Sequence, residues 1–123
     1  MRYFIVFLGG GVGALTRYIA GAAIMRRYGG LFPLGTLVIN VTGSFLIGLL
    51  MTLLTETWNL DPYWRLALVV GFLGGYTTFS SFEYESYRAI RDGGQWLGFL
   101  NIAGSVLLGY LAVWTGAVIG GHR

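Results

Sequence analysis

The sequence predicts an all-α integral membrane protein with four transmembrane helices. Only 11% of its 123 residues are charged, whereas a soluble domain has about a quarter. The mean hydropathy is +0.68. The apolar residues form four blocks, each long enough to cross a bilayer core, which takes roughly 20 helical residues. We therefore expect a single transmembrane domain over residues 1–123.

Polar or turn-forming residues separate the expected helices. The first spans about 3–25 and stops at paired arginines and glycines. The second spans about 31–54 and has a proline suited to a first turn. The third spans about 62–88, because Asp61 is placed to cap it and a proline follows. The fourth spans about 96–120.

The third helix is expected to be broken near the middle of the membrane. The segment GFLGGYTTFSSFEYES follows an apolar run and brings together glycines, hydroxyl groups and phenylalanines. Gly74 and Gly75 lie about 12 residues after the start of this helix, which is roughly 18 Å along its axis. Unwinding at 74–78 would free carbonyl groups, which lipid tolerates only where protein, an ion or water binds them.

The arginines are almost evenly divided between the two sides of the predicted membrane domain. One side carries Arg2, Arg65 and Arg123, and the other carries Arg26, Arg27, Arg88 and Arg91. Orientation follows an excess of Lys and Arg on the cytoplasmic side, so this near tie favours insertion both ways round. The alternative is a fixed topology set by the difference of one charge. Because four short helices cannot enclose a wide pathway, we expect an antiparallel, dual-topology homodimer.

Polar side chains recur at helical spacing within three of the expected helices. They are Thr36, Asn40 and Ser44; Thr77, Thr78, Ser80 and Ser81; and Asn101 and Ser105. Intramembrane polar residues mark interhelical bonds or a permeation path. A lone serine or threonine usually bonds to its own helix, but an asparagine amide is harder to satisfy locally. Stripes that face one another therefore favour a pathway.

The composition of this polar track suits an anion. No Asp, Glu or Lys lies deep in an expected helix, whereas a cation carrier normally places a carboxylate there. Phe79 and Phe82 share a helical face and could turn their positive ring edges toward the track, although simple packing is the ordinary role of such rings. Arg17, the deepest charge, either snorkels toward the surface or attracts anions into a vestibule.

Other classes of function are excluded by what the sequence lacks. There is no cysteine, and the single histidine cannot form a multi-histidine metal site. No P-loop is present, so coupling to ATP is not expected, and we expect no enzymatic activity. The arginines flank the apolar blocks and form no basic face, so lipid headgroups are expected partners and nucleic acid is not.

Three ordered motifs resemble the Fluc/CrcB family of bacterial fluoride channels. They are GGGVGALTRY at 9–18, GTLVINVTGSFLIG at 35–48 and GFLGGYTTFSSF at 71–82. The resemblance covers essentially the whole chain. It implies a passive fluoride-selective channel in the bacterial inner membrane, with two pores in each antiparallel homodimer.

The resemblance also implies roles for individual residues. Phe79 and Phe82 would be the pore aromatics, and Asn40 the amide donor in the middle of the pore. Thr78 and Ser80 would line the track or hold the break.

Three further assignments concern the pore, a vestibule and a bound ion. Asn101 and Ser105 are assigned to the fluoride pore from their spacing, and Arg17 to a vestibule. The resemblance implies that the backbone carbonyls of Gly74 and Thr77 bind a structural sodium ion at the centre of the dimer.

Two other functions stay open on sequence grounds. A small dual-topology exporter of organic cations would carry a membrane-embedded glutamate in its first helix, where this chain has Arg17. A membrane subunit without transport activity would use its glycines and hydroxyl groups only for assembly.

Overall fold

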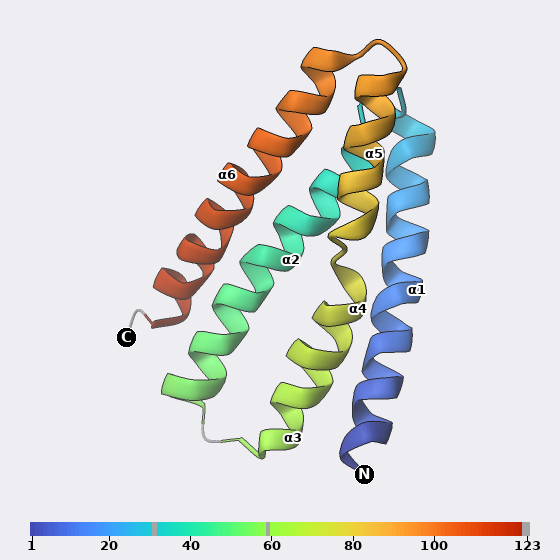
Figure 1. Ribbon diagram of the computed structural model, residues 1–123. Helices are drawn as coiled ribbons and strands as arrows, with labels where there is room; N and C mark the ends of the chain where they lie inside the picture. The colour runs from blue at the N-terminus through green and yellow to red at the C-terminus, as the bar shows by residue number, and fades with distance from the viewer. Residues whose placement is uncertain (31, 59, 122–123) are drawn as a thin grey trace.

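The chain folds into helices that cross the predicted membrane region four times. The computed structural model describes residues 1–30, 32–58 and 60–121. Its elements, drawn in Figure 1, are α1 (Arg2–Tyr28), α2 (Leu34–Thr52), the π-helical η1 (Leu53–Thr57), α3 (Pro62–Arg65), the π-helical η2 (Leu66–Leu73), α4 (Gly74–Tyr76), α5 (Ser80–Arg91) and α6 (Gln95–Gly121). Among the described residues, three continuous segments are long and apolar enough to span a bilayer, namely α1, α2 with η1, and α6. The fourth crossing is made by α3, η2, α4 and α5 together.

The helix ends lie close to those expected from the sequence. The expected first and fourth helices, 3–25 and 96–120, are each slightly longer in the structure. The second begins at Leu34 instead of residue 31, which lies outside the described residues. Asp61 caps α3 as expected, because its Oδ1 accepts a hydrogen bond from the Tyr63 amide at 2.9 Å.

The break in the third crossing lies slightly later than the glycines suggested. Gly74 has helical backbone angles and belongs to α4 with Gly75. The chain leaves the helix at Thr77, which is extended with φ −85° and ψ 158°, and re-enters it at Ser80. The expected unwinding at the glycines is therefore wrong, and the break occupies residues 77–79. The glycines instead allow close packing, since a Cβ on Gly75 would overlap the Gly10 carbonyl of α1.

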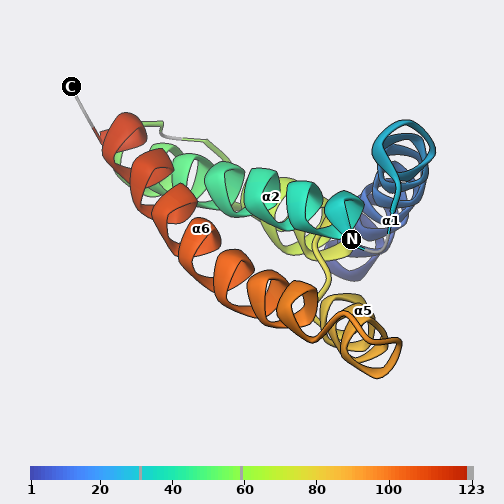
Figure 2. The ribbon, with the colours of Figure 1, turned by 90° about the horizontal axis from the view of Figure 1, so that it is seen from above.

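The described helices form an open assembly. α6 packs along α2 and α5, while α1 packs along η2, α4 and α2. Seen from above in Figure 2, α1 and α6 lie on opposite sides of α2. In Figure 1 the N-terminus, α3 and the last turns of α6 lie at the same end. This arrangement places Arg2 and Arg65 at that end, as the count of arginines assumed. The opposite end carries Arg26, Arg27, Arg88 and Arg91. Arg123 lies outside the described residues.

Glycines at the helix contacts explain how α2 and α6 come so close together. Gly48 of α2 and Gly116 of α6 are both buried. A Cβ on Gly48 would overlap the Val113 carbonyl, and one on Gly116 would overlap the Phe45 carbonyl. In lipid, contacts of this kind stabilise helix pairs by van der Waals packing, since apolar burial gives little gain there.

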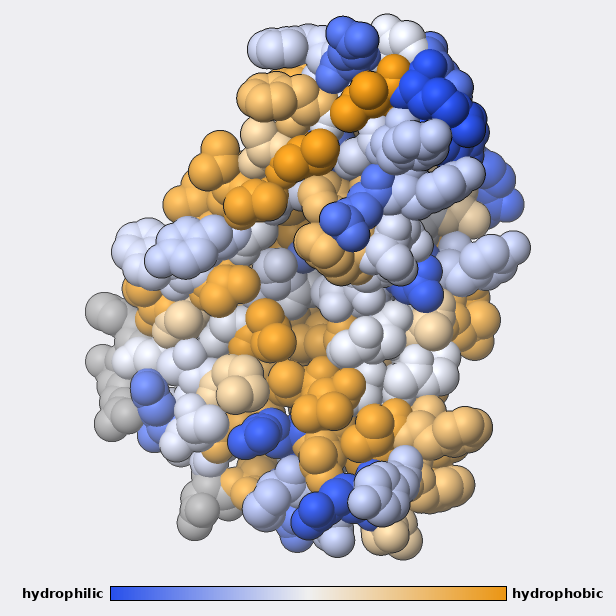
Figure 3. All heavy atoms as spheres, in the orientation of Figure 1, coloured by the Kyte–Doolittle hydropathy of each residue, from blue (hydrophilic) through white to orange (hydrophobic). Residues whose placement is uncertain are grey.

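Most large apolar side chains face outward. The buried apolar side chains among the described residues are Ile39, Val69, Leu73, Phe82 and Ala89. Figure 3 shows apolar residues over the middle of one face and hydrophilic ones gathered mainly toward its upper end. This distribution is the one expected of a protein whose solvent is lipid over most of its height.

The glycine contacts predict a position-specific effect on stability. Gly116→Ala should destabilise the protein by about 1–3 kcal/mol, because the added methyl group meets the backbone of α2. Gly104→Ala is the matched control on the same helix, since no atom lies within 4 Å of its added Cβ. It should leave stability unchanged or raise it by up to about 1 kcal/mol, because alanine favours helix over glycine. Thermal unfolding of both variants in detergent distinguishes them, and equal midpoints would contradict the packing role.

Candidate functional site

The centre of the candidate site is a pair of hydrogen bonds between α2 and the break. Asn40 Nδ2 donates to the Thr78 carbonyl at 2.8 Å, and the Thr78 amide donates to Asn40 Oδ1 at 2.9 Å. The Asn40 amide therefore hydrogen-bonds to both the carbonyl and the N–H of Thr78, as a neighbouring peptide group would. The break lies between helical residues 62–76 and 80–91, where an unsatisfied backbone group is costly. This pair gives Asn40 a structural reason to lie within the membrane.

Thr78 also starts the helix that follows the break. Its Oγ1 accepts a hydrogen bond from the Ser81 amide at 3.2 Å, as a capping hydroxyl does at a helix N-terminus. The Glu83 amide bonds to the Phe79 carbonyl at 3.0 Å. Through its side chain and backbone, Thr78 thus links α5 to α2.

Arg17 of α1 binds the last turn before the break. Its Nε donates to the Gly75 carbonyl at 3.2 Å, a group that the break leaves without its usual helical partner. Arg17 also lines a hollow of about 250 Å³ with Thr78 and Ser81. The side chain is turned inward to the break, so the snorkelling alternative is wrong for this structure.

The two phenylalanines lie together but in different environments. Their ring centroids are 5.7 Å apart, with the planes tilted by 49°. Phe82 is 6% exposed and belongs to the core, whereas Phe79 is 70% exposed. Phe79 extends from the break into the open, so any enclosure of its ring has to come from outside this subunit.

An open groove of about 480 Å³ runs past the break between α2 and η2. Its polar lining residues are Asn40, Ser44, Thr77 and Thr78, and Phe79 lies at its side. None of the described residues that line it is charged. The expected stripe on α2 is confirmed in part, because Asn40 and Ser44 face this groove and Thr36 faces the hollow beside Arg17.

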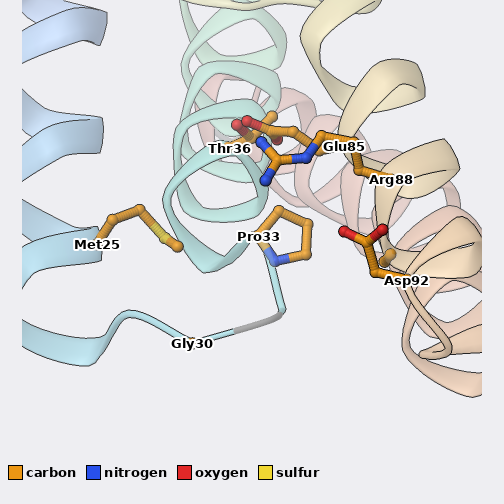
Figure 4. Close-up of a pocket in the computed structure, with 8 residues that line it drawn as sticks. Met25, Gly30, Pro33, Thr36, Glu85, Arg88 and Asp92 are labelled. Atoms are coloured by element: carbon orange, nitrogen blue, oxygen red, sulfur yellow. The ribbon is translucent and has the colours of Figure 1, made fainter.

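A second hollow leads toward the end of the protein that holds the α5–α6 connection. It has about 230 Å³ and shares Met25, Thr36 and Glu85 with the hollow beside Arg17. Figure 4 shows its lining from α1, α2 and α5, with Arg88 reaching toward Thr36. In the described part of the chain, Glu85 Oε1 is buried and has no hydrogen-bond partner. Sequence reasoning did not single out Glu85, although it follows Ser81 by one turn on the same face.

The remaining predicted residues lie apart from the groove. Asn101 is buried between α6 and α5, where Ser105 Oγ donates to its Oδ1 at 3.3 Å. Ser80 is exposed at the start of α5. None of these three residues lines the groove or the hollow beside Arg17, and their assignment to the pore stays a prediction.

Backbone carbonyls are the groups near the break that suit a metal ion. The described residues contain no cluster of three or more His, Cys, Asp or Glu side chains that could hold one. Gly74 and Thr77 both line the groove, and Gly74 is exposed. Among the described residues, neither carbonyl oxygen accepts a hydrogen bond other than those made within a helix. Their oxygens lie at the C-terminal end of a helical segment, where the partial charge is negative, so they fit a hard cation.

The chain is similar to known proteins over almost its full length. The model of the CrcB-like protein family, described as Camphor Resistance (CrcB), matches residues 4–117. The chain is 63% identical to the fluoride-specific ion channel FluC of Solibacter usitatus, strain Ellin6076, over 97% of this chain and 98% of that protein. The protein of the same name from Acidobacterium capsulatum is 52% identical over 98% and 96% of the two chains. That from Pyrococcus horikoshii is 40% identical over 94% and 92%. This chain therefore belongs to the CrcB-like protein family.

Proposed function

We propose that this protein is a passive, fluoride-selective channel of the bacterial inner membrane, built from two oppositely inserted copies with two pores. The observation that carries the proposal is the break at 77–79, where Asn40 and Phe79 meet in a groove without charged lining residues. The names of the relatives support the choice of ion, since all three are called fluoride-specific ion channels.

Unused hydrogen-bond donors at the break suit a small anion. An asparagine amide has two N–H groups, and Asn40 uses one on the Thr78 carbonyl in the described part of the chain. The second can donate to an ion in the groove. The Thr78 hydroxyl accepts from Ser81, so its own proton also remains available. Ser80, two residues after Thr78, is exposed at the start of α5, and its hydroxyl is a further donor for an ion that leaves the groove.

The phenyl rings can complete this environment without adding charge. A ring has a positive edge and a negative face, and Phe79 is exposed beside the donors of Asn40 and Thr78. The ring of Phe82 supplies a second edge, with its centroid 5.7 Å from that of Phe79. A narrow site with strong donors and ring edges replaces the tightly held water of fluoride more readily than a wide one, which is how pore linings select ions.

Passive conduction is sufficient to export fluoride. Hydrogen fluoride is a weak acid that crosses lipid as a neutral molecule and ionises in the less acidic cytoplasm. The membrane potential then drives the anion out, at about 2.3 kcal/mol per charge for 100 mV. Arg17, turned toward the break and lining the adjoining hollow, can raise the local anion concentration on this route.

The groove supports a dimer, because a single subunit leaves it uncovered. Asn40, Ser44 and Thr77 would otherwise place polar groups against acyl chains, which is unfavourable in lipid. A second copy placed by a two-fold axis covers the same face on both subunits. An axis in the membrane plane gives the inverted pair that the arginine balance favours, and it generates two equivalent pores.

The same axis supports a structural sodium ion at the centre of the dimer. Gly74 and Thr77 line the groove of each copy, so two copies can supply four backbone carbonyl oxygens. Bound there, the ion would neutralise the partial negative charge of two facing helix ends.

The first test measures fluoride release from liposomes that contain the purified protein. Wild type should release fluoride rapidly and chloride hardly at all. Phe82→Ile should reduce fluoride release by roughly tenfold or more, about 1.4 kcal/mol, because it removes the buried ring beside Phe79. Phe7→Ile, on the outer face of α1, is the matched control and should behave as wild type. Equal release of both halides by wild type would refute a fluoride-selective channel.

A second test concerns the amide at the break. Asn40→Asp should abolish most fluoride release, because a carboxylate cannot donate to the Thr78 carbonyl and repels an anion. The same liposome assay measures it. Release at the wild-type rate would show that neither the amide donors nor the paired hydrogen bonds are required.

A third test addresses insertion in both orientations. The chain has no cysteine, so a single reporter at Leu60 or Gln95, at opposite ends of the protein, can be labelled with an impermeant maleimide. About half of each variant should react from outside. Adding Arg26→Gln and Arg27→Gln should shift the ratio, since the balance of arginines is then lost. Labelling of only one reporter in the parent chain would contradict dual topology.

A further inference from the structure

A chain of hydrogen bonds joins α6 to the helix that carries Phe82. Ser105 Oγ donates to Asn101 Oδ1 at 3.3 Å, and Asn101 Nδ2 donates to Ser86 Oγ at 2.8 Å. Ser86 Oγ in turn donates to the Phe82 carbonyl at 2.8 Å. Asn101 is 0% exposed and Ser86 is 2% exposed. The chain therefore runs through the interior and ends on the backbone of a proposed pore residue.

The contact between the two helices is close enough to fix this geometry. Gly98 lies one turn before Asn101, and a Cβ there would overlap the Ile90 side chain and lie 3.0 Å from the Ser86 carbonyl. Ser86 and Ala89 are buried on the facing side of α5. With no side chain at Gly98, α6 approaches α5 closely, and the Asn101 amide reaches the Ser86 hydroxyl directly.

Within the subunit, helix α5 depends on its contact with α6. The break at 77–79 separates it from the preceding helix, and within the subunit it packs mainly on α6, with only slight contact to α2. A shift of α6 along α5 would therefore move Phe82 relative to Asn40, which is held by α2. Buried hydrogen-bonded side chains specify such a register because a shifted arrangement leaves them unsatisfied.

We infer that Asn101 is a positioning residue, which sets Phe82 through Ser86 and does not itself touch the permeating ion. Its oxygen and one N–H are bound to Ser105 and Ser86, and it is fully enclosed. The consequence for fluoride passage rests on the function proposed above. The positioning itself is a property of the fold.

The experiment places one 4-fluorophenylalanine at position 82 and records its ¹⁹F NMR spectrum in the full-length protein. Asn101→Leu keeps the approximate volume of the side chain but removes both hydrogen-bonding groups. We expect the resonance at position 82 to shift or split, while the same label at Phe7 is unchanged. Fluoride release should fall roughly tenfold, or about 1.4 kcal/mol, and selectivity over chloride should decrease. Thr115→Val is the matched control on α6, since that hydroxyl bonds to the Leu111 carbonyl of its own helix.

Each outcome bears on the inference. An unchanged resonance at position 82 with reduced fluoride release would overturn it and favour direct contact of Asn101 with the ion. An unchanged resonance with unchanged release would overturn it as well. Should Asn101→Leu fail to fold, Ser86→Ala removes only one oxygen and must give the same shift at position 82. If wild type released no fluoride, the proposed function would fail, whereas the ¹⁹F comparison would still test the positioning.

Discussion

The structure depends on how it satisfies a backbone that is interrupted inside a membrane. Residues 77–79 leave the helix within an expected membrane span, where an unsatisfied peptide group is costly. The Asn40 amide pairs with both polar groups of Thr78, and Arg17 takes the Gly75 carbonyl. Two separate helices, α2 and α1, are thereby tied to the break. An interruption that would destabilise a lipid-exposed helix instead becomes the point where the subunit is held together.

The sequence predicted the helices well, but it did not predict where the break lies or which neighbour each helix face meets. The Asp61 cap and the length of three of the apolar blocks are local signals, and the structure confirms them. The four-residue stripe on α2 is a periodic signal and is confirmed in part, because Asn40 and Ser44 line the groove and Thr36 does not. The position of the break is not a local property. Gly74 and Gly75 favoured unwinding by their flexibility, but the helix opens where Asn40, 38 residues earlier, can bind Thr78.

The neighbour of the polar face on the fourth helix is likewise not a local property of the sequence. Spacing showed that Asn101 and Ser105 share a face, but periodicity does not say which neighbour that face meets. Gly98 decides it, because the close approach it allows turns this face toward Ser86. Ser86 carried no signal of its own, since a serine in a helix usually bonds only to its own backbone.

In the inverted dimer proposed above, the break and the arginine balance serve one requirement. The groups that the break does not use within the subunit are exposed in an open groove, together with Phe79. Covering that groove with an identical groove requires a two-fold axis, and the groove runs along the membrane-spanning helices. An axis parallel to the membrane normal would leave both copies in the same orientation. A strong excess of arginines on one side would be enough to set that single orientation. An axis in the membrane plane needs the chain to insert both ways in comparable amounts, which a strong bias would prevent. A nearly even distribution of arginines is therefore what a subunit needs if its unsatisfied face is to find an inverted partner.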